Sequence, residues 1–307
     1  MRILVTGGAG FIGSNLVKAL VDRGDEVTVL DDFSVGRMEH LEDINPKRLE
    51  VISGSVCDLE LMRKLITNTD TVFHLAVQCL VACNHNPVLA QQVNVGGTFN
   101  VCLAACEAHA KVVYISSSEI YGTCKISPMA ENHPIEPQSI YGLSKLISEQ
   151  YVRSFHKYHN LPAVIIRPFN AYGPNHRNDQ YAAVITSFIN RLEKGEPLII
   201  EGTGEQSRDF TYVSDIVDGI ILLSTLENGE AINVGNGYAT TIKDLAATLF
   251  RIYNMKENII YKPERINNVF KLESDIKRAN SYGYEPKVSL EEGLKKYISW
   301  LRKNNGR

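Results

Sequence analysis

Six short apolar runs in the first half of the chain alternate with longer segments of mixed polarity. The runs are "RILVTG", "EVTVLD", "LEVISG", "TVFHLA", "KVVYISS" and "PAVIIRP". They are rich in Val and Ile and do not alternate between apolar and polar positions, which is typical of strands buried on both faces. The segments between them are long enough for helices. The pattern therefore predicts an α/β fold, a doubly wound parallel sheet with helices on both sides.

The second half has a more mixed pattern. "TTIKD" and "SLEEGLKKYISWL" each open with a hydroxyl residue and carry an acid three residues later, Thr241 with Asp244 and Ser289 with Glu292. This spacing is a capping box, which marks the start of a helix. We expect these helices to belong to a smaller, mixed α/β substrate-binding domain.

The boundary between the two domains is expected near "RPFNAYGP", where the strand pattern stops and two prolines and a glycine intervene. Residues 1–167 are then the cofactor-binding domain, and residues 168–307 form mainly the substrate domain. "EAINVGN" has the composition of a further buried strand. It predicts that the chain rejoins the large domain at about residues 210–236.

Composition excludes several classes of partner. The chain has 307 residues, of which 44% are hydrophobic and 22% charged, and its formal net charge is -3. A mildly acidic protein has no broad attraction for nucleic acid or anionic membranes, so an anionic ligand must be held by a few local cations. The start of the chain lacks a basic leader followed by an apolar core, and no apolar run approaches the length of a membrane span. We expect a cytoplasmic protein.

Six cysteines raise the question of a metal site or disulfides. Cys79 with Cys83 and Cys102 with Cys106 are one helical turn apart, but no CxxC occurs and both pairs lie among apolar or small residues. Cysteine in such surroundings acts as a small hydrophobic residue. We expect no metal.

A glycine-rich segment, "VTGGAGFIGSNLVKAL", follows the first strand and opens a helix. Gly8, Gly10 and Gly13 fit G-x-G-x-x-G, and Gly7, Gly10 and Gly13 fit the variant G-x-x-G-x-x-G. Residues without a side chain allow a tight turn and let backbone amides approach a pyrophosphate, which then lies at the positive end of the helix. The segment predicts a Rossmann-type dinucleotide site.

Two carboxylates end the second strand. Asp31 lies at about the twenty-residue offset at which an acid binds the adenosine ribose of a dinucleotide, and Asp32 adds a second negative charge. Together they would repel the 2'-phosphate of NADP. We therefore expect the cofactor to be NAD.

Tyr141 and Lys145 form Y-x-x-x-K in "QSIYGLSKLISEQYV". Four residues apart on a helix, they share one face and can meet the same ligand. Tyrosine has a pKa near 10, and a nearby ammonium favours the phenolate and brings that pKa toward neutrality. Upstream, "ISSSEIYG" places three hydroxyls and Glu119 at the carboxyl end of a strand, where ligands of such sheets bind.

Taken together, these motifs resemble the extended short-chain dehydrogenases/reductases that modify nucleotide-diphosphate sugars. The resemblance covers nearly the whole length, in "TGGAGFIGS", "LDDFSVGR", "GSVCD", "FHLAVQ", "NVGGT", "SSSEIYG", "YGLSK", "RPFNAYGP", "GTGEQSRDFTYVSD" and "EPKVSLEEGL". Members of this family include 4-epimerases, 4,6-dehydratases and UDP-glucuronate decarboxylases, all of which begin by oxidising carbon 4 of the sugar with bound NAD. The resemblance also implies a homodimer formed through the long helices, including the "YGLSK" helix.

The resemblance assigns roles by position. Ser117 and Tyr141 would hold the sugar 4-hydroxyl, with Tyr141 as the base, and Lys145 would bind the nicotinamide ribose. The expected cofactor-binding residues are Gly7, Gly10, Phe11, Ile12, Gly13, Asp31, Asp32, Ser34, Asp58, Leu75, Ala76, Tyr141 and Lys145. The expected substrate-binding residues are Ser117, Ser118, Asn170, Arg208 and Arg265, the last three near the diphosphate.

Glu119 leaves the reaction open. Epimerases of this family usually have a small residue at its position, whereas dehydratases have a Glu that removes the carbon 5 proton, often preceded by an Asp that is Ser118 here. A decarboxylase would be expected to have an arginine where "KLESDI" offers only Lys271. Alternatively, Glu119 caps a backbone group, which leaves a 4-epimerase of a UDP-sugar as our first expectation. Proteins of this fold that only sense NAD are a non-enzymatic alternative.

Overall fold

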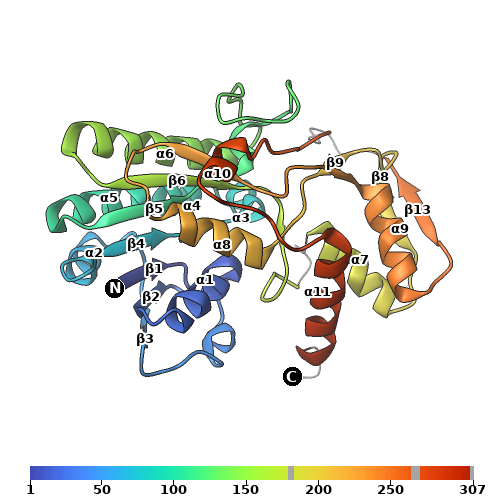
Figure 1. The fold of residues 1–307 in the computed structure, drawn as a ribbon, viewed down its shortest axis with the longest axis horizontal. Coiled ribbons are helices and arrows are strands. Elements are labelled where there is room, and N and C mark those ends of the chain that lie inside the picture. Colours follow the sequence, from blue (N-terminus) through green and yellow to red (C-terminus); the bar gives the residue numbers. More distant parts are fainter. Residues whose placement is uncertain (179–182, 264–269, 305–307) are drawn as a thin grey trace.

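The computed structural model describes residues 1–178, 183–263 and 270–304 (Figure 1). Its larger part is built on a seven-stranded sheet in the order β11-β6-β5-β4-β1-β2-β3, in which all neighbours are parallel. The strands are β1 (Arg2–Thr6), β2 (Glu26–Asp31), β3 (Leu49–Ser53), β4 (Thr71–His74), β5 (Lys111–Ile115), β6 (Ala163–Pro168) and β11 (Ala231–Val234). The doubly wound sheet and all six strands expected in the first half are confirmed.

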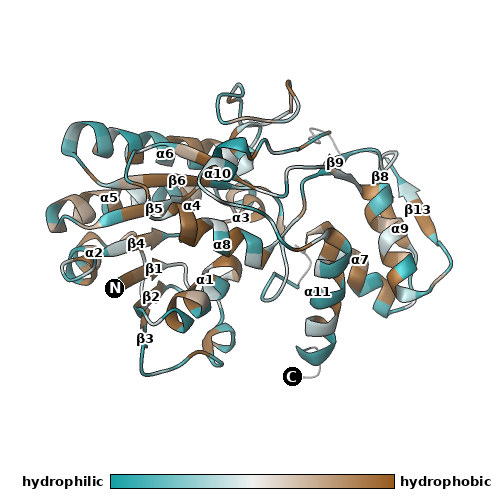
Figure 2. Cartoon of the chain, viewed as in Figure 1, coloured by the Kyte–Doolittle hydropathy of each residue, from teal (hydrophilic) through white to brown (hydrophobic). Residues whose placement is uncertain are grey.

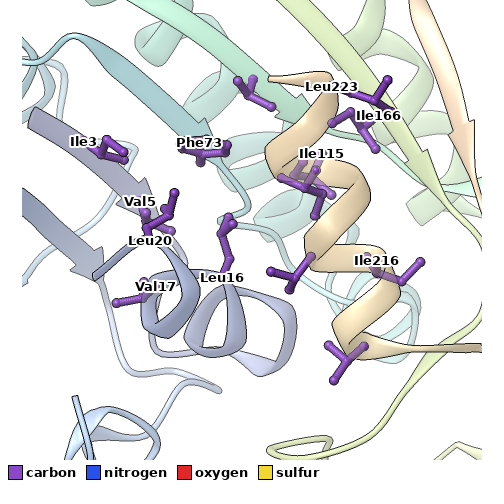
Figure 3. Close-up of a cluster of buried hydrophobic side chains, with 14 of the residues drawn as sticks. Ile3, Val5, Leu16, Val17, Leu20, Phe73, Ile115, Ile166, Ile216 and Leu223 are labelled. Atoms are coloured by element: carbon purple, nitrogen blue, oxygen red, sulfur yellow. The ribbon is translucent and has the colours of Figure 1, made fainter. Parts of the chain in front are cut away.

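Helices cover both faces of this sheet because successive strand residues point to opposite sides. Ile3 and Val5 of β1 pack with α1 (Phe11–Asp22) and α8 (Val213–Leu223), as Figure 3 shows. Leu4, between them, belongs to the core on the other face, under α2 (Leu59–Ile66), α5 (Gly97–Ala108) and α6 (Ile140–His159). Figure 2 shows the strands of this sheet largely in brown, the colour of hydrophobic residues.

The smaller part lies on the right of Figure 1 and has its own apolar core. It is formed by α7 (Val184–Glu193), β8 (Leu198–Glu201), α9 (Ile242–Tyr253), β13 (Ile259–Lys262) and α11 (Leu290–Asn304). Both expected capping boxes start helices there. Thr241 Oγ1 accepts from the Asp244 amide at 3.0 Å, and Ser289 Oγ accepts from the Glu292 amide at 3.3 Å.

Short elements complete the described chain. They are η1 (Met38–Leu41), α3 (Leu80–His85), α4 (Pro87–Ala90), η2 (Gln91–Gly96), η3 (Ser118–Ile120), β7 (Ala171–Tyr172), β9 (Ser207–Arg208), β10 (Thr211–Tyr212), β12 (Thr240–Thr241) and α10 (Lys277–Ser281). β7 pairs with β10, and β9 pairs with β12.

The chain passes between the two parts more than once. β11 pairs with β6, so the strand expected in "EAINVGN" is confirmed as part of the large sheet. A bridge between Met129 and Ser274 also joins the loop after η3 to the segment before α10. The division into domains at residues 167 and 168 stays a prediction. Among the described residues, no helix combines the length and apolarity needed to cross a bilayer.

Candidate active site

A cavity of about 1510 Å³ opens at the carboxyl ends of the parallel strands. Its walls come from the loops after β1, β2, β4, β5 and β6, and from α7, β8 and β9 of the smaller part. Pockets for one small molecule usually have volumes of about 300 to 1,000 Å³. This cavity therefore has room for a dinucleotide together with a second ligand.

The glycine loop forms one end of the cavity. Gly7 has a φ of +69°, and a Cβ there would lie 2.7 Å from the amide nitrogen of Ala76. A Cβ on Gly13 would lie 2.1 Å from the carbonyl oxygen of Gly7, so only glycine allows α1 to pack this closely on the loop. Within the described part of the chain no side chain caps α1, and its first turn contains no acid, which leaves the positive helix end available to an anion. Phe11 and Ile12 line the cavity beside it.

The two aspartates after β2 have different surroundings. Asp31 is buried, and its Oδ2 accepts from the Ala9 amide at 2.9 Å while its Oδ1 accepts from the Phe33 amide at 2.9 Å. Burial raises the pKa of Asp31, and these two bonds lower it. Asp32 is exposed and accepts from the amide and hydroxyl of Ser34, at 3.0 and 2.6 Å. Asp31 thus also shapes the glycine loop, while Asp32 is the more accessible carboxylate.

Asp58 is not among the residues that line the cavity, although Val56, two residues before it, is. It is exposed and caps α2, accepting from the Leu61 amide at 3.0 Å. Its role in binding the cofactor stays a prediction. Leu75 and Ala76, after β4, do line the cavity.

Ser117 and Tyr141 meet at the carboxyl end of β5. Ser117 starts η3, and Tyr141 lies in the first turn of α6 behind the cap Ser139, whose Oγ accepts from the Gly142 amide at 3.0 Å. Gly142 permits the approach, because a Cβ there would lie 2.6 Å from the carbonyl oxygen of Glu119. Burial raises the pKa of Tyr141, while a hydrogen bond with the Ser117 side chain lowers it.

Lys145, one turn after Tyr141 on α6, is buried and also lines the cavity. Its Nζ donates to the carbonyl oxygen of Ile115 at 2.5 Å and lies 4.5 Å from the centre of the Tyr114 ring. Burial lowers the pKa of Lys145 to about 7. We expected its ammonium to lower the pKa of Tyr141, but burial outweighs any such effect here, since the pKa of Tyr141 is raised and the lowering group is Ser117.

The expected substrate residues lie farther along the cavity. Ser118, Asn170 and Arg208 all line it. Asn170 Oδ1 is buried and has no hydrogen-bond partner among the described residues, which suits a polar ligand. Burial lowers the pKa of Arg208, and the charge of Glu119 raises it. Arg265 lies outside the described residues.

Comparison with known proteins decides the family. Residues 3–235 match the model of the "NAD dependent epimerase/dehydratase family". The chain is 35% identical over 307 residues to a putative UDP-glucose 4-epimerase of Methanocaldococcus jannaschii, covering 99% of both chains. This chain belongs to the NAD-dependent epimerase/dehydratase family.

The fold of this chain also superposes closely on solved structures of similar enzymes. A UDP-glucose 4-epimerase from Thermotoga maritima, solved with UDP-glucose, superposes with a TM-score of 0.94 at 34% identity, covering 99% of this chain and 100% of that one. A dTDP-glucose 4,6-dehydratase from Streptomyces venezuelae, solved with NAD, gives 0.92 at 30% identity, covering 100% and 98%. The predicted family and the cofactor NAD are confirmed.

Other family members carry out different reactions. The chain is 34% identical to UDP-glucuronic acid decarboxylase 1 of Arabidopsis thaliana, over 98% of this chain and 70% of that protein. The family therefore establishes a nucleotide-sugar epimerase, dehydratase or decarboxylase, and it does not select among them. The glycine loop and the room in the cavity fit NAD, which supplies a hydride acceptor when bound.

Glu119 faces the cavity beside Arg208. Burial raises the pKa of its carboxyl, and the Arg208 charge lowers it. The carboxylate accepts no hydrogen bond from residues 1–178, 183–263 or 270–304, whereas the Glu119 amide donates to Ser117 Oγ at 3.2 Å. The alternative in which Glu119 caps a backbone group is therefore not what the structure shows.

Asn94 also supports the site, although the sequence did not lead us to expect it. It lies in η2, a single turn of π-helix, and its Nδ2 donates to Ser144 Oγ at 2.8 Å. Its Oδ1 accepts from the Gln78 amide at 2.7 Å. Asn94 thus ties the helix of Tyr141 to the segment after β4. "NVGGT" contains it, but the irregular helix turn, a frequent feature of functional sites, has no clear local signature.

Proposed function

We propose that this protein is an NAD-dependent 4-epimerase acting on a UDP-sugar. The observation that carries the proposal is the meeting of the Ser117 and Tyr141 side chains in a cavity that also contains the glycine loop. Oxidation at carbon 4 needs a proton acceptor next to a hydride acceptor, and this arrangement supplies a place for both. The likeness to epimerases over almost the full length of both chains supports the same choice.

In this proposal Tyr141 removes the proton of the sugar 4-hydroxyl while the hydride leaves carbon 4. Ser117 holds the same oxygen and orients it. Lys145 holds the nicotinamide ribose. To do so, its ammonium must either turn away from the Ile115 carbonyl or donate to the carbonyl and the ribose at the same time. The resulting ketone then exposes its other face and receives the hydride there, with the proton returned by Tyr141.

The diphosphate would lie between Asn170 and Arg208. A protein with a net charge of -3 needs local cations to hold an anionic ligand. Arg208 supplies a planar fork of donors that matches phosphate oxygens. Arg265 remains a proposed second arginine for the same group.

The relation between Glu119 and Arg208 favours epimerisation over elimination. Each is the charged group that acts on the pKa of the other. A carboxylate that compensates a half-buried guanidinium contributes to charge balance and need not act as a base. Epimerisation requires no base at carbon 5.

A 4,6- or 5,6-dehydratase is the second candidate, and one observation favours it. Burial raises the pKa of Glu119, which makes its carboxylate a stronger base, and its charge also acts on Tyr141. In that reaction Glu119 would remove the carbon 5 proton. A decarboxylase ranks third, because Lys271 occupies the position where we expect an arginine.

Products identify the reaction directly. The protein would be incubated with NAD and a panel of UDP-, dTDP- and GDP-sugars, and the products analysed by NMR and mass spectrometry. We expect a UDP-sugar to be converted to its 4-epimer with no change in mass. A loss of 18 mass units would indicate a dehydratase, and a loss of 44 mass units would indicate a decarboxylase. If the protein binds NAD but converts none of the sugars, it is the NAD-sensing module.

We also propose that the protein is a homodimer through α5 and α6. Apolar side chains on these helices remain exposed, among them Phe99, Leu143 and Tyr151 at 38%, 46% and 36%. A second copy would cover them. Light scattering after size exclusion should give about twice the monomer mass of 34.2 kDa, and Leu143→Glu should reduce it to the monomer.

A further inference from the structure

A buried ion pair lies one helical turn beyond Lys145. Glu149 and Arg167 are 0% and 1% exposed. Arg167 Nε donates to Glu149 Oε1 at 2.9 Å, and Arg167 Nη2 donates to Oε2 at 2.7 Å. Removing two charges from water costs about as much as their attraction returns, so stability alone is a poor explanation for such a pair.

The pair connects the segments that carry the site. Arg167 Nη1 donates to the Tyr121 hydroxyl at 2.8 Å, and that hydroxyl donates to Asn233 Oδ1 at 2.7 Å. Tyr121 follows the "SSSE" turn by two residues, and Arg167 precedes Asn170 by three. One guanidinium thus joins α6, the turn after β5 and the end of β6.

Glu149 shares a helix face with the reacting residues. Tyr141, Lys145 and Glu149 follow one another at intervals of four on α6, which places them on one side of the helix. Glu149 itself is not among the residues that line the cavity. It reaches the site only through its charge and its hold on the helix.

The charge of Glu149 acts on Lys145. Burial lowers the pKa of Lys145, and Glu149 is the foremost group that raises it. The titratable groups around Lys145 come from several elements, namely Glu149 and Tyr141 on α6, Cys83 on α3, His74 on β4 and Tyr114 on β5. Arg167, Arg153, Tyr121 and Tyr114 in turn face Glu149.

We infer that Glu149, oriented by Arg167, is a positioning residue that keeps Lys145 protonated, the state in which its ammonium can bind the nicotinamide ribose. A carboxylate four residues away offsets the cost of a buried ammonium, and the fork of Arg167 fixes where that carboxylate lies. This inference rests on the role of Lys145 in the proposed function.

The pH dependence of NAD binding tests the inference. The dissociation constant of NAD would be measured by calorimetry between pH 5.5 and 9 on protein freed of nucleotide. A protonated Lys145 binds the ribose, so the constant should rise above the pH at which free Lys145 loses its proton. Lys145→Met should remove this rise.

Glu149→Gln is the informative variant. Without the carboxylate, and with Arg167 still charged, the dissociation constant of NAD should begin to rise about one pH unit lower than in the unmodified protein. At pH values above both onsets, the variant should therefore bind NAD about tenfold more weakly. An unchanged pH dependence would overturn the inference. A rise that persists in Lys145→Met would overturn the role of Lys145 in the proposed function as well.

Two further variants separate charge from packing, even where Glu149→Gln folds poorly. Glu149→Gln/Arg167→Met leaves no unpaired buried charge and should recover thermal stability, while the rise still begins at a lower pH than in the unmodified protein. Recovery of the original pH dependence in this double variant would show a structural role only, against the inference. Tyr121→Phe removes a bond to Arg167 but no charge, so it should lower stability and leave the pH dependence in place.

Discussion

The Asp31 carboxylate and the Ala9 amide form a hydrogen bond of 2.9 Å between the end of β2 and the glycine loop. The residue expected to bind the adenosine ribose is therefore also a support of the loop expected to bind the pyrophosphate. The two functions are expected to fail together when Asp31 is changed.

The two aspartates after β2 should affect cofactor binding in different ways. Asp31→Ala should weaken NAD binding by about 1 to 3 kcal/mol and also lower the melting temperature, because the charged acceptor of two backbone amides is lost. Asp32→Ala is the matched control, since Asp32 is exposed, and should mainly relax discrimination against NADP. Calorimetry with both cofactors measures this. Equal affinity of the unmodified protein for NAD and NADP would contradict the expectation.

Tyr141→Phe should abolish hydride transfer while NAD still binds. The change removes the proton acceptor and little volume, so the cavity keeps its shape. Absorbance at 340 nm after addition of UDP-glucose reports reduction of bound NAD, and calorimetry reports its binding. Ser117→Ala, which removes the hydroxyl that lowers the pKa of Tyr141, should shift the basic requirement of the pH-rate profile upward. A normal rate in Tyr141→Phe would exclude Tyr141 from the chemistry.

Glu119→Gln distinguishes the proposed reactions. Epimerisation needs only departure and return of the hydride at carbon 4, so this substitution of similar size should retain most activity. In heavy water the product should carry no deuterium at carbon 5. Loss of a positioned general base typically lowers a rate ~100- to 10,000-fold. Such a loss, together with deuterium at carbon 5 or carbon 6, would assign Glu119 as the base of a dehydratase.

The NAD-free protein should become more stable as pH rises above 7, relative to its Lys145→Met variant. The folded pKa of Lys145 is about 7, and lysine in an unfolded chain titrates near 10.4. Between these values the unfolded state binds more protons, so the free energy of unfolding rises with pH, by up to about 1.4 kcal/mol per unit. Urea titrations of both proteins at pH 7 and 9 measure the difference. Buried cysteines and tyrosines oppose this trend in both proteins and cancel in the comparison.

The large sheet and the glycine loop could be predicted because their causes are local. Uninterrupted Val and Ile runs, such as "PAVIIRP", allow little except strands buried on both faces. Gly7 and Gly13 leave a recognisable spacing because contacts at 2.7 and 2.1 Å exclude any Cβ. Tyr141 and Lys145 could be paired for the same reason, since a helix places residues four apart on one face.

Tertiary structure alone decided how charge is distributed around these residues. The sequence predicts Glu119 next to the sugar or turned away from it, and packing placed it beside Arg208, 89 positions later in the chain. In the same way, Lys145 was expected to act on Tyr141, and burial against Ile115 and Tyr114 gave its ammonium other partners. Periodicity fixes which face of an element is buried, whereas pKa values depend on solvent exclusion and on charges brought in by distant segments, and only the folded chain determines both.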